Sequence, residues 1–397
     1  MEWKEVRLCD VCSELSDGLH KAPKFIEKGE YIFVNAKNLY NGYILDNDPT
    51  KKTSHEEYLK YKKPLGKHTI LYSIDGTIGN IAKYRGEKCV LGKGACYLNC
   101  NPKIVVSSYL YYQLQSPHFK SYIHLMSTGS TIKHISLKTM REYVFELPSL
   151  TDQRRIASIL SSLDRKIELN NKINADLEEM AQAIFKNWFV DFEPFKDGKF
   201  VDSELGMIPE GWKVGSPYEY VKVVYGAPYK SAKFNDNGEG LPLIRIRDLK
   251  DCNPQFYTPE ILPQTEYVNM GDIVAGMDAE FIPHIWKGNT GLLNQRVCKL
   301  MPQQTSISNL FVLYLMKPEL EFVQSYKTGT TVSHLGKADI DKFVVVLPPL
   351  KVVEECSKIL DSILQRIKNI SAESRTLSLL RDTLLPRLMS GELEVPQ

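Results

Sequence analysis

The sequence lacks any run of about eighteen apolar residues, the length that a helix needs to cross a bilayer. Its first residues, 1–5, are polar and lack the apolar stretch of a secretory signal. Neither membrane insertion nor secretion is therefore expected, and the sequence predicts a cytoplasmic protein.

The sequence also lacks a complete motif for phosphate binding or methyl transfer. The stretch from Gly86 to Lys93 resembles a phosphate loop, but it is one residue too long, and Gly94 stands where a Ser or Thr would bind magnesium. The stretch 253–256, Asn-Pro-Gln-Phe, resembles the Asn-Pro-Pro-Phe loop of adenine methyltransferases, but no glycine-rich cofactor loop accompanies it. We therefore predict no catalytic residue and no cofactor.

His134 and His334 recur at matching places in the chain. Neither has an evident Ser, Cys or carboxylate partner in the sequence, and a general base needs such a group within hydrogen-bond reach. We therefore expect both to be positioning or packing residues.

The cysteines form no clear metal-binding pattern. Cys9, Cys12, Cys96 and Cys100 could supply four zinc ligands, but neither pair lies in an obvious zinc ribbon. A long cytosolic chain keeps its thiols reduced, so packed free cysteines are the preferred interpretation and no metal site is predicted.

A strong excess of one charge is absent as well, since the formal net charge is only +2. The charge is uneven, however: residues 1–150 hold 21 Lys and Arg against 15 Asp and Glu, whereas residues 201–350 hold 14 against 17. Because non-specific DNA binding scales with the cations placed at the phosphates, the first half could bind DNA well, and the second would need a locally positive face. Charge alone leaves the question open.

What the chain does contain is a long internal duplication. Residues 127–134 (Ser-Thr-Gly-Ser-Thr-Ile-Lys-His) are echoed by residues 327–334 (Lys-Thr-Gly-Thr-Thr-Val-Ser-His), and Leu147-Pro148 by Leu347-Pro348. Upstream, residues 69–75 match residues 272–278 with a small shift in spacing. A period this long is not a solenoid, so it indicates two copies of one domain-plus-helix unit.

Each copy has the same predicted order of elements. Short β-like runs come first, then a short amphipathic helix (around Tyr109–Gln115 or Leu310–Met316), a strand ending in Leu-Pro, and a long helix. The predicted fold class is α+β: two similar β-rich globular domains separated by two long antiparallel coiled-coil helices, with a pseudo-twofold internal repeat. The predicted boundaries are 1–150 and 201–350 for the globular domains, 151–200 for the central helix and connector, and 351–397 for the C-terminal helix.

The two long helices are predicted from a three–four spacing of apolar residues sustained over about four heptads, each running about 35 residues. Thr151 is a plausible N-cap, and Pro386 should end or kink the second helix. Asn170 and Asn174 fall in the middle of the first seam, where they would either fix the register or simply be less buried. The two seams contain the following residues: Ile156, Leu160, Leu163, Ile167, Asn170, Asn174, Leu177, Ala181, Ile184 and Trp188; and Cys356, Leu360, Ile363, Ile367, Ile370, Ser374, Leu377, Arg381, Leu384 and Leu388.

Two related domains joined by an antiparallel helix pair match the local twofold symmetry of duplex DNA. Because the copies differ in sequence, each should read its own short motif, and the target should be split and asymmetric. The predicted base-reading side chains are those that form bidentate contacts with guanine or adenine, with solvated polar side chains at strand ends as the alternative. They are Asn35, Lys37, Asn38 and Lys93 in the first copy, and Arg245, Arg247, Asn294, Gln295 and Arg296 in the second.

Two glycine-bearing loops provide a second class of candidate. Small hydroxyl residues with exposed backbone amides suit phosphate contacts, although a simple turn would look the same. The candidates are Thr128, Gly129, Ser130, Thr131 and Lys133 in the first copy, and Thr328, Gly329, Thr330 and Thr331 in the second.

Three segments resemble the specificity subunits of type I restriction–modification systems: residues 204–212, 147–156 and 384–393. The resemblance covers essentially the whole chain. It implies a non-catalytic subunit that binds double-stranded DNA, recruits two modification (methyltransferase) subunits through its helices, and joins restriction (translocase and nuclease) subunits in the full complex. A self-contained methyltransferase or nuclease and a coiled-coil scaffold that binds no DNA remain the alternatives.

The resemblance also suggests a partner contact at the end of the central helix, where Trp188, Phe189 and Phe192 would anchor a modification subunit. These aromatic residues, with Phe195, could equally pack the helix end onto a recognition domain.

The second copy departs from the first at two places. Val353 replaces Gln153 at the start of the long helix, which makes this junction atypical. Residues 75–79 (Asp-Gly-Thr-Ile-Gly) become residues 278–282 (Asp-Ala-Glu-Phe-Ile), so a different loop geometry is expected there.

Overall fold

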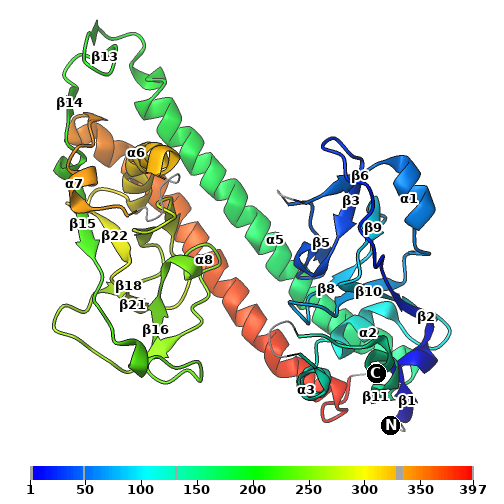
Figure 1. Ribbon diagram of the computed structural model, residues 1–397. Coiled ribbons are helices and arrows are strands. Elements are labelled where there is room, and N and C mark those ends of the chain that lie inside the picture. Colours follow the sequence, from blue (N-terminus) through cyan, green and yellow to red (C-terminus); the bar gives the residue numbers. More distant parts are fainter. Residues whose placement is uncertain (1–2, 48–49, 130–132, 328–333, 396–397) are drawn as a thin grey trace. The chain divides into compact units, whose positions relative to one another are not determined.

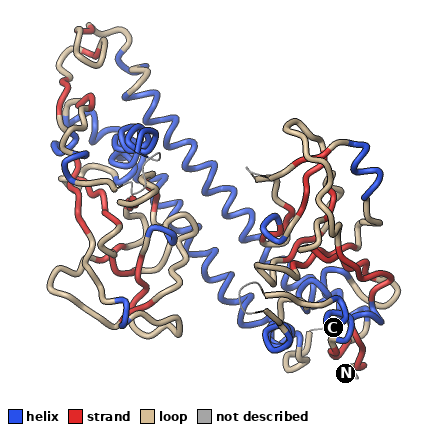
Figure 2. Tube along the Cα trace, viewed as in Figure 1, coloured by secondary structure: helices blue, strands red, loops and turns tan. Residues whose placement is uncertain are grey.

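The computed structural model describes residues 3–47, 50–129, 133–327 and 334–395. The chain divides into two compact units: Met1–Lys166 with Leu377–Gln397, and Ile167–Thr376. Each unit combines β-sheets of its own with helical segments (Figures 1 and 2).

The first unit contains an antiparallel sheet with the strand order β2-β10-β7-β8, a three-stranded sheet β6-β3-β9, and the strand pairs β1-β11 and β4-β5. Its strands are β1 (Lys4–Arg7), β2 (Cys12–Asp17), β3 (Tyr31–Val34), β4 (Leu39–Tyr40), β5 (Tyr43–Ile44), β6 (Lys52–Thr53), β7 (Thr69–Ser73), β8 (Ile81–Lys83), β9 (Cys89–Leu91), β10 (Ala95–Cys100) and β11 (Val144–Leu147). Its shorter helices are η1 (Leu8–Val11), η2 (Ala36–Asn38), α1 (His55–Tyr61), α2 (Ser107–Gln113), α3 (Pro117–Met126) and α4 (Leu137–Glu142).

The second unit repeats this plan. It contains an antiparallel sheet β15-β22-β19-β20, a sheet β17-β16-β21-β18, and the pairs β14-β23 and β12-β13. Its strands are β12 (Phe200–Val201), β13 (Ile208–Pro209), β14 (Lys213–Gly215), β15 (Val221–Tyr225), β16 (Leu241–Ile244), β17 (Tyr257–Thr258), β18 (Tyr267–Val268), β19 (Ile273–Gly276), β20 (Pro283–Ile285), β21 (Gly291–Leu293), β22 (Val297–Pro302) and β23 (Val345–Leu347). Its shorter helices are η3 (Glu193–Phe195), η4 (Pro217–Glu219), η5 (Ser231–Lys233), η6 (Ile246–Asp248), α6 (Asn309–Lys327) and α7 (Lys337–Ile340).

The strand register shows which residues of the two units correspond to one another. Ala95 pairs with Ser73 in the first unit, as Val297 pairs with Gly276 in the second. The parallel pairs match too, because β3–β9 aligns Val34 with Leu91 and β16–β21 aligns Ile244 with Leu293. The predicted duplication is therefore present in three dimensions, and the predicted fold class is confirmed.

The two long helices are α5 (Leu150–Phe189) and α8 (Leu350–Met389), each of 40 residues, or about 60 Å at 1.5 Å per residue. Both are longer than the predicted 35 residues. The cap of α5 is Ser149 and not Thr151, because the Ser149 Oγ accepts a hydrogen bond from the Asp152 N–H at 3.2 Å. Pro386 does not end α8, which continues to Met389.

The helices pair in an antiparallel sense within each unit. In the first unit the Arg381 guanidinium lies 2.9 Å from the Asp164 carboxylate. In the second, the side-chain amides of two asparagines cross the seam: Asn170 donates to Glu373 at 2.7 Å and Asn174 to Ser371 at 3.0 Å. Both asparagines are buried, so the interpretation as less buried positions is wrong; buried polar pairs of this kind are typical of register-setting sites.

The junction between strand and long helix differs between the copies as predicted, and the structure shows how the second copy compensates. In the first, the buried Gln153 side chain accepts the Val106 N–H at 2.8 Å and donates to the Pro148 carbonyl at 2.9 Å. In the second, the Tyr220 hydroxyl donates to the Pro348 carbonyl at 2.5 Å, and the Ser357 hydroxyl accepts the Ser308 N–H at 2.9 Å. Val353 can therefore be apolar without leaving these backbone groups unpaired.

A second local difference concerns the helix that follows the main sheet. Two helices, α2 and α3, stand where the second copy has the single helix α6, which passes through Pro318. The predicted short helix at Leu310–Met316 is therefore only the first part of a 19-residue helix.

Each unit has its own apolar core. The largest core of the first unit joins β7 and β10 to α2 and to the adjoining ends of α5 and α8, through residues such as Leu160 and Leu388. The largest core of the second joins β19 and β22 to α6 and to the other ends of the same helices, through residues such as Phe185 and Leu360. No helix in the described part of the chain is both long enough and apolar enough to span a membrane.

Candidate nucleic-acid interface

A cluster of three charged or titratable side chains lies beyond the end of β7 in the first unit. Asp75 follows β7 closely, and an isolated antiparallel bridge pairs its backbone with that of His134. The His134 Nδ1–H donates to the Asp75 Oδ1, and the Lys93 Nζ lies 4.0 Å from the other carboxylate oxygen, Oδ2. Three segments distant in sequence thus meet at one carboxylate.

The second unit has the same cluster beyond β19. The His334 Nδ1–H donates to the Asp278 Oδ1 at 2.7 Å, and the Arg296 Nη1 lies 3.0 Å from the Asp278 Oδ2. The backbone bridge recurs between Asp278 and His334. The Arg296 Nη1 also donates to the Asp278 Oδ1 at 3.4 Å, so the guanidinium contacts both carboxylate oxygens, whereas the contact given for Lys93 is with Oδ2 of Asp75.

The two cations occupy neighbouring positions of the repeat. When the two copies are aligned by strand register, Lys93 is equivalent to Gln295, and Gly94 is equivalent to Arg296. Both cations nevertheless reach the equivalent aspartate, because both lie on the tight turn that joins the equivalent strands (β9–β10 and β21–β22).

The expectation that His134 and His334 lack a carboxylate partner is therefore wrong. The sequence did contain the signal, since Asp75 and Asp278 lie at matching places of the repeat. The sequence does not show that each histidine contacts its aspartate, because the two residues are 59 positions apart in the first copy and 56 in the second.

The structure separates the predicted base-reading residues of the first copy. Asn38 is buried, and its side chain is used inside the fold: it accepts the Asn35 N–H at 3.0 Å and donates to the Leu45 carbonyl at 3.1 Å. It stabilises a turn, which is the structural alternative. Lys37 is exposed and Asn35 is half-buried, and both line a pocket of about 280 Å³ with Phe33.

The matching residues of the second copy behave in a parallel way. Asp248 is buried and accepts both the backbone N–H of Arg245, at 3.0 Å, and its Nε–H, at 3.3 Å. The Arg245 guanidinium lies over the Phe256 ring, 4.3 Å from its centroid. Arg247 is exposed.

The predicted residues of the β21–β22 turn, 294–296, also include both a buried residue and exposed ones. Asn294 is buried and its side-chain oxygen accepts the Arg296 N–H at 3.2 Å, so it shapes the turn. Gln295 and Arg296 are exposed. In the first copy the position of Asn294 is Gly92, and the Asn35 side chain occupies the space beside it. The two copies thus build the same turn with different side chains.

The glycine-bearing loops are described only in part. Thr128 and Gly129 are exposed, as is Lys133, and the backbone of Thr128 pairs with that of His134 through two hydrogen bonds of 2.9 and 3.1 Å. The predicted residues Ser130, Thr131, Thr328, Gly329, Thr330 and Thr331 lie outside the described residues. In the first copy, His134 therefore holds one end of the loop next to Asp75.

Near these turns, cations lie over aromatic rings, which were not predicted from the sequence. The Lys51 Nζ lies 4.8 Å from the centroid of Phe25 in the first copy, and Arg245 covers Phe256 in the second. Lys51 and Phe256 are equivalent positions. The Lys51 carbonyl accepts the N–H of Phe33 in β3, and the Phe256 carbonyl accepts the N–H of Leu243, the matching residue of β16. A cation on an aromatic face occurs in both copies, but the position of the cation Lys51 in the first copy is that of the aromatic Phe256 in the second, so no simple sequence match reveals it.

The loop after the aspartate begins with the same backbone conformation in both copies, and the expected difference in loop geometry lies beyond this first residue. Gly76 has φ of 71° and the equivalent Ala279 has φ of 61°, which is the left-handed region. The loop then shortens by one residue, because Ile81 of β8 corresponds to Pro283 of β20. An alanine in this conformation is strained by about 1 kcal/mol.

We expect Ala279→Gly to raise the free energy of unfolding by about 0.5–1 kcal/mol, because glycine adopts the left-handed conformation without steric strain. The Ala279 side chain is exposed, so little packing is lost. Urea denaturation provides the measurement, and Gly76→Ala is the matched control: a Cβ there meets no atom within 4 Å, so its expected loss of about 1 kcal/mol would be conformational. A stability decrease for Ala279→Gly would contradict this account.

Comparison with known proteins identifies the family. The family model described as "Type I restriction modification DNA specificity domain" matches residues 1–179 and 209–377, which is most of the chain and one match for each copy. The chain belongs to this family.

Individual relatives agree with this membership of the specificity-domain family. The chain is 28% identical to the type I restriction enzyme MjaIX specificity subunit of Methanocaldococcus jannaschii, over 100% of this chain and 94% of that protein. It is 22% identical to the HindI specificity subunit of Haemophilus influenzae, over 99% of this chain and 100% of that one. The crystal structure of a type I restriction–modification S subunit from M. genitalium has the same fold, with a TM-score of 0.54 and 17% identity over 98% of this chain and 96% of that chain. The predicted family is confirmed.

The aromatic residues at the end of α5 pack inside the second unit of this specificity-domain protein. Phe189 is buried, with ring centroids 5.2 Å from Phe311 and 6.0 Å from Trp212. Phe192 lies 5.4 Å from Trp212. Trp188 is half-buried against the same core. For Phe189 the structure thus shows the packing alternative; a partner contact through the half-buried Trp188 and Phe192 stays a prediction.

The described cysteines are free thiols, and burial raises the pKa of Cys96 and Cys100 to about 12. Both thiols are therefore neutral near pH 7. Among the described residues no group of three or more His, Cys, Asp or Glu side chains is arranged to hold a metal ion.

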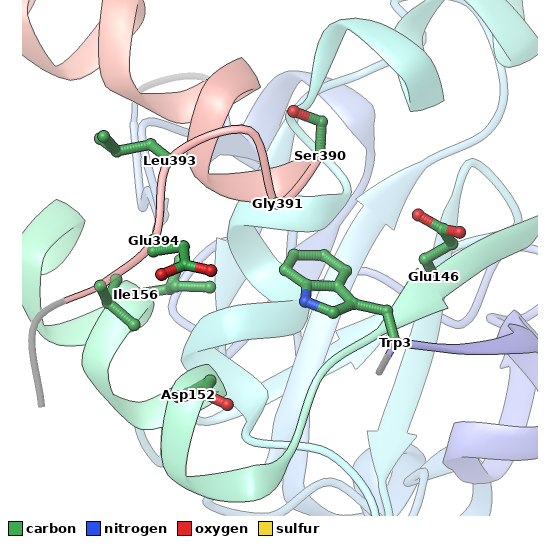
Figure 3. A pocket seen from close by; sticks show the side chains of 9 residues that line it. Trp3, Glu146, Asp152, Ile156, Ser390, Gly391, Leu393 and Glu394 are labelled. Carbon is green, nitrogen blue, oxygen red and sulfur yellow. The ribbon is translucent and has the colours of Figure 1, made fainter. Parts of the chain in front are cut away.

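A pocket of the first unit lies near the start of α5. It has a volume of about 230 Å³, and the Trp3 indole extends towards the turn at Gly391 (Figure 3). Its polar side chains are Ser390 and the three carboxylates shown in Figure 3, those of Glu146, Asp152 and Glu394. The pocket shares no residue with the Asp–His clusters, so it lies outside the candidate interface.

Proposed function

We propose that this chain is the DNA sequence-specificity subunit of a type I restriction–modification complex, in which each β-rich domain reads one half of a bipartite, asymmetric target. The observation that carries the proposal is the duplicated cluster: an aspartate, a histidine and an exposed cation recur at equivalent places in both copies. Around each cluster the side chains differ, for example Asn35 against Arg245. Two domains with a shared framework and different exposed side chains are what two distinct half-site specificities require.

The helices would set the number of base pairs between the half-sites. A continuous helix is stiff, and α5 and α8 each contain residues of both units. The buried Asn170 and Asn174 pairs support a fixed register, because a slip of the seam would leave their side-chain amides unpaired.

We further propose that the exposed faces of the helices bind two modification subunits, and that restriction subunits join them in the full complex. Large apolar side chains are exposed on both helices, which is a common feature of protein-binding surfaces. They are Leu169 and Met180 on α5, and Ile359, Leu379 and Leu380 on α8.

The test is to co-express the chain with the modification subunit encoded beside it and to map methylated adenines across the host genome. We expect one split, asymmetric motif with a constant gap. Methylation without this chain at the same motif, or turnover by this chain alone with S-adenosylmethionine or magnesium, would contradict the proposal.

A further inference from the structure

Side chains near the clusters differ between the copies, for example Asn35 against Arg245, but a group of an aspartate, a histidine and a cation recurs in both. A carboxylate, Asp75 or Asp278, accepts a hydrogen bond from an imidazole and has a cation within 4.0 Å. Groups that are the same in both copies cannot distinguish two different half-sites. Their shared role must therefore concern a feature that both half-sites have.

The cations are placed to act outwards. Lys93 and Arg296 are about half exposed, with side-chain exposures of 51% and 56%, whereas the aspartates beneath them are at 26% and 28%. Both described contacts of the Arg296 guanidinium with Asp278 are formed by Nη1. The carboxylate restrains a side chain that would otherwise lose rotamer freedom on binding a ligand.

The histidine also connects the same carboxylate to a residue that lies six or seven positions before it in the chain. In the first copy the Thr128 N–H donates to the His134 carbonyl at 3.1 Å, and in the second the Lys327 Nζ donates to the His334 carbonyl at 2.8 Å. Each histidine thus accepts a hydrogen bond through its backbone carbonyl and contacts the aspartate through its ring.

The Asp–His–cation cluster contributes little to the stability of the fold, so stability does not explain why it recurs in both copies. Ion pairs between exposed side chains contribute only about 0–1 kcal/mol. The cation also comes from different chain positions in the two copies, although a purely structural contact would keep one position.

We propose that Asp75 and Asp278 are positioning residues for DNA binding: each, together with its histidine, holds one cation so that both half-sites are bound at a backbone phosphate in the same way. This inference rests on the proposed function. Base discrimination then belongs to the side chains that differ between the copies, and the Asp–His–cation cluster supplies affinity that is independent of sequence.

The experiment uses the full chain purified with its modification subunit and two DNA duplexes, one with the mapped target and one with that target scrambled. Binding is measured by fluorescence anisotropy over a range of potassium chloride concentrations. The slope of log K against log salt is negative, and we expect Arg296→Ala to make it less steep by about 0.9, the value for one lost phosphate contact. Binding to both duplexes should weaken by about tenfold.

Coupling between Asp278 and Arg296 distinguishes positioning from an unrelated structural role. We expect Asp278→Asn to weaken binding, and the double variant with Arg296→Ala to bind no worse than Arg296→Ala alone. His334→Asn should retain binding, because the Asn amide can donate where Nδ1 does, whereas His334→Ala should not. Asp75, Lys93 and His134 should give the same pattern in the first copy.

Lys213→Ala is the matched control, because Lys213 forms an exposed ion pair with Glu219 at 2.7 Å outside the cluster, and it should leave the slope unchanged. Additive losses for Asp278→Asn and Arg296→Ala, or an Arg296→Ala loss confined to the target duplex, would overturn the inference. Failure of the unaltered complex to bind either duplex would instead overturn the proposed function.

Discussion

Exchanging residues 1–150 for the equivalent domain of another specificity subunit is expected to change one half of the methylated motif and to leave the other half as it was. The physical reason is that the two copies have separate cores and separate Asp–His–cation clusters, one in each unit. The motif before and after the exchange is read by mapping methylated adenines in cells that carry the modification subunit.

The graft has one structural requirement. The first unit packs Leu385, Leu388 and Met389 of α8 into its core, and Gly391 lies against Trp3, so the incoming domain must offer an equivalent apolar surface to the end of α8. The control is the reciprocal exchange of residues 201–350, which should change only the other half. Loss or change of both halves by either exchange, with the protein still folded, would contradict the division of labour between the domains.

The second large effect concerns stability. Phe189→Ala is expected to lower the free energy of unfolding by about 3–5 kcal/mol, since it removes a buried ring from an aromatic cluster and leaves a cavity. The lost contacts are those with Phe185, Trp212 and Phe311, whose ring centroids lie 5.0, 6.0 and 5.2 Å away. Urea denaturation followed by tryptophan fluorescence measures the change.

The neighbouring residue supplies the control for that experiment. Val190 is 56% exposed, and Val190→Ala should change stability by less than about 0.5 kcal/mol. If Phe189→Ala left stability intact and instead abolished binding of the modification subunit, Phe189 would be a partner anchor and its packing role would be secondary.

The burial of side chains explains why the candidate DNA-binding residues were only partly predictable. Asn35, Lys37 and Asn38 look alike as polar turn residues, yet only Asn38 is buried and used by the fold. Polarity is a local property of the sequence, whereas burial depends on the strands that pack around the turn. The sequence therefore located the turns but could not say which of their side chains remain exposed.

The amino-acid sequence by itself determined the duplication, the two long helices and the family, because repeats and the three–four spacing of apolar residues are written along the chain. Only the tertiary structure decided which distant side chains meet: Asp75 with His134, Asp278 with His334, and a cation beside each from different positions of the repeat. These contacts depend on how strands far apart in the sequence align with one another, and no local pattern specifies that alignment.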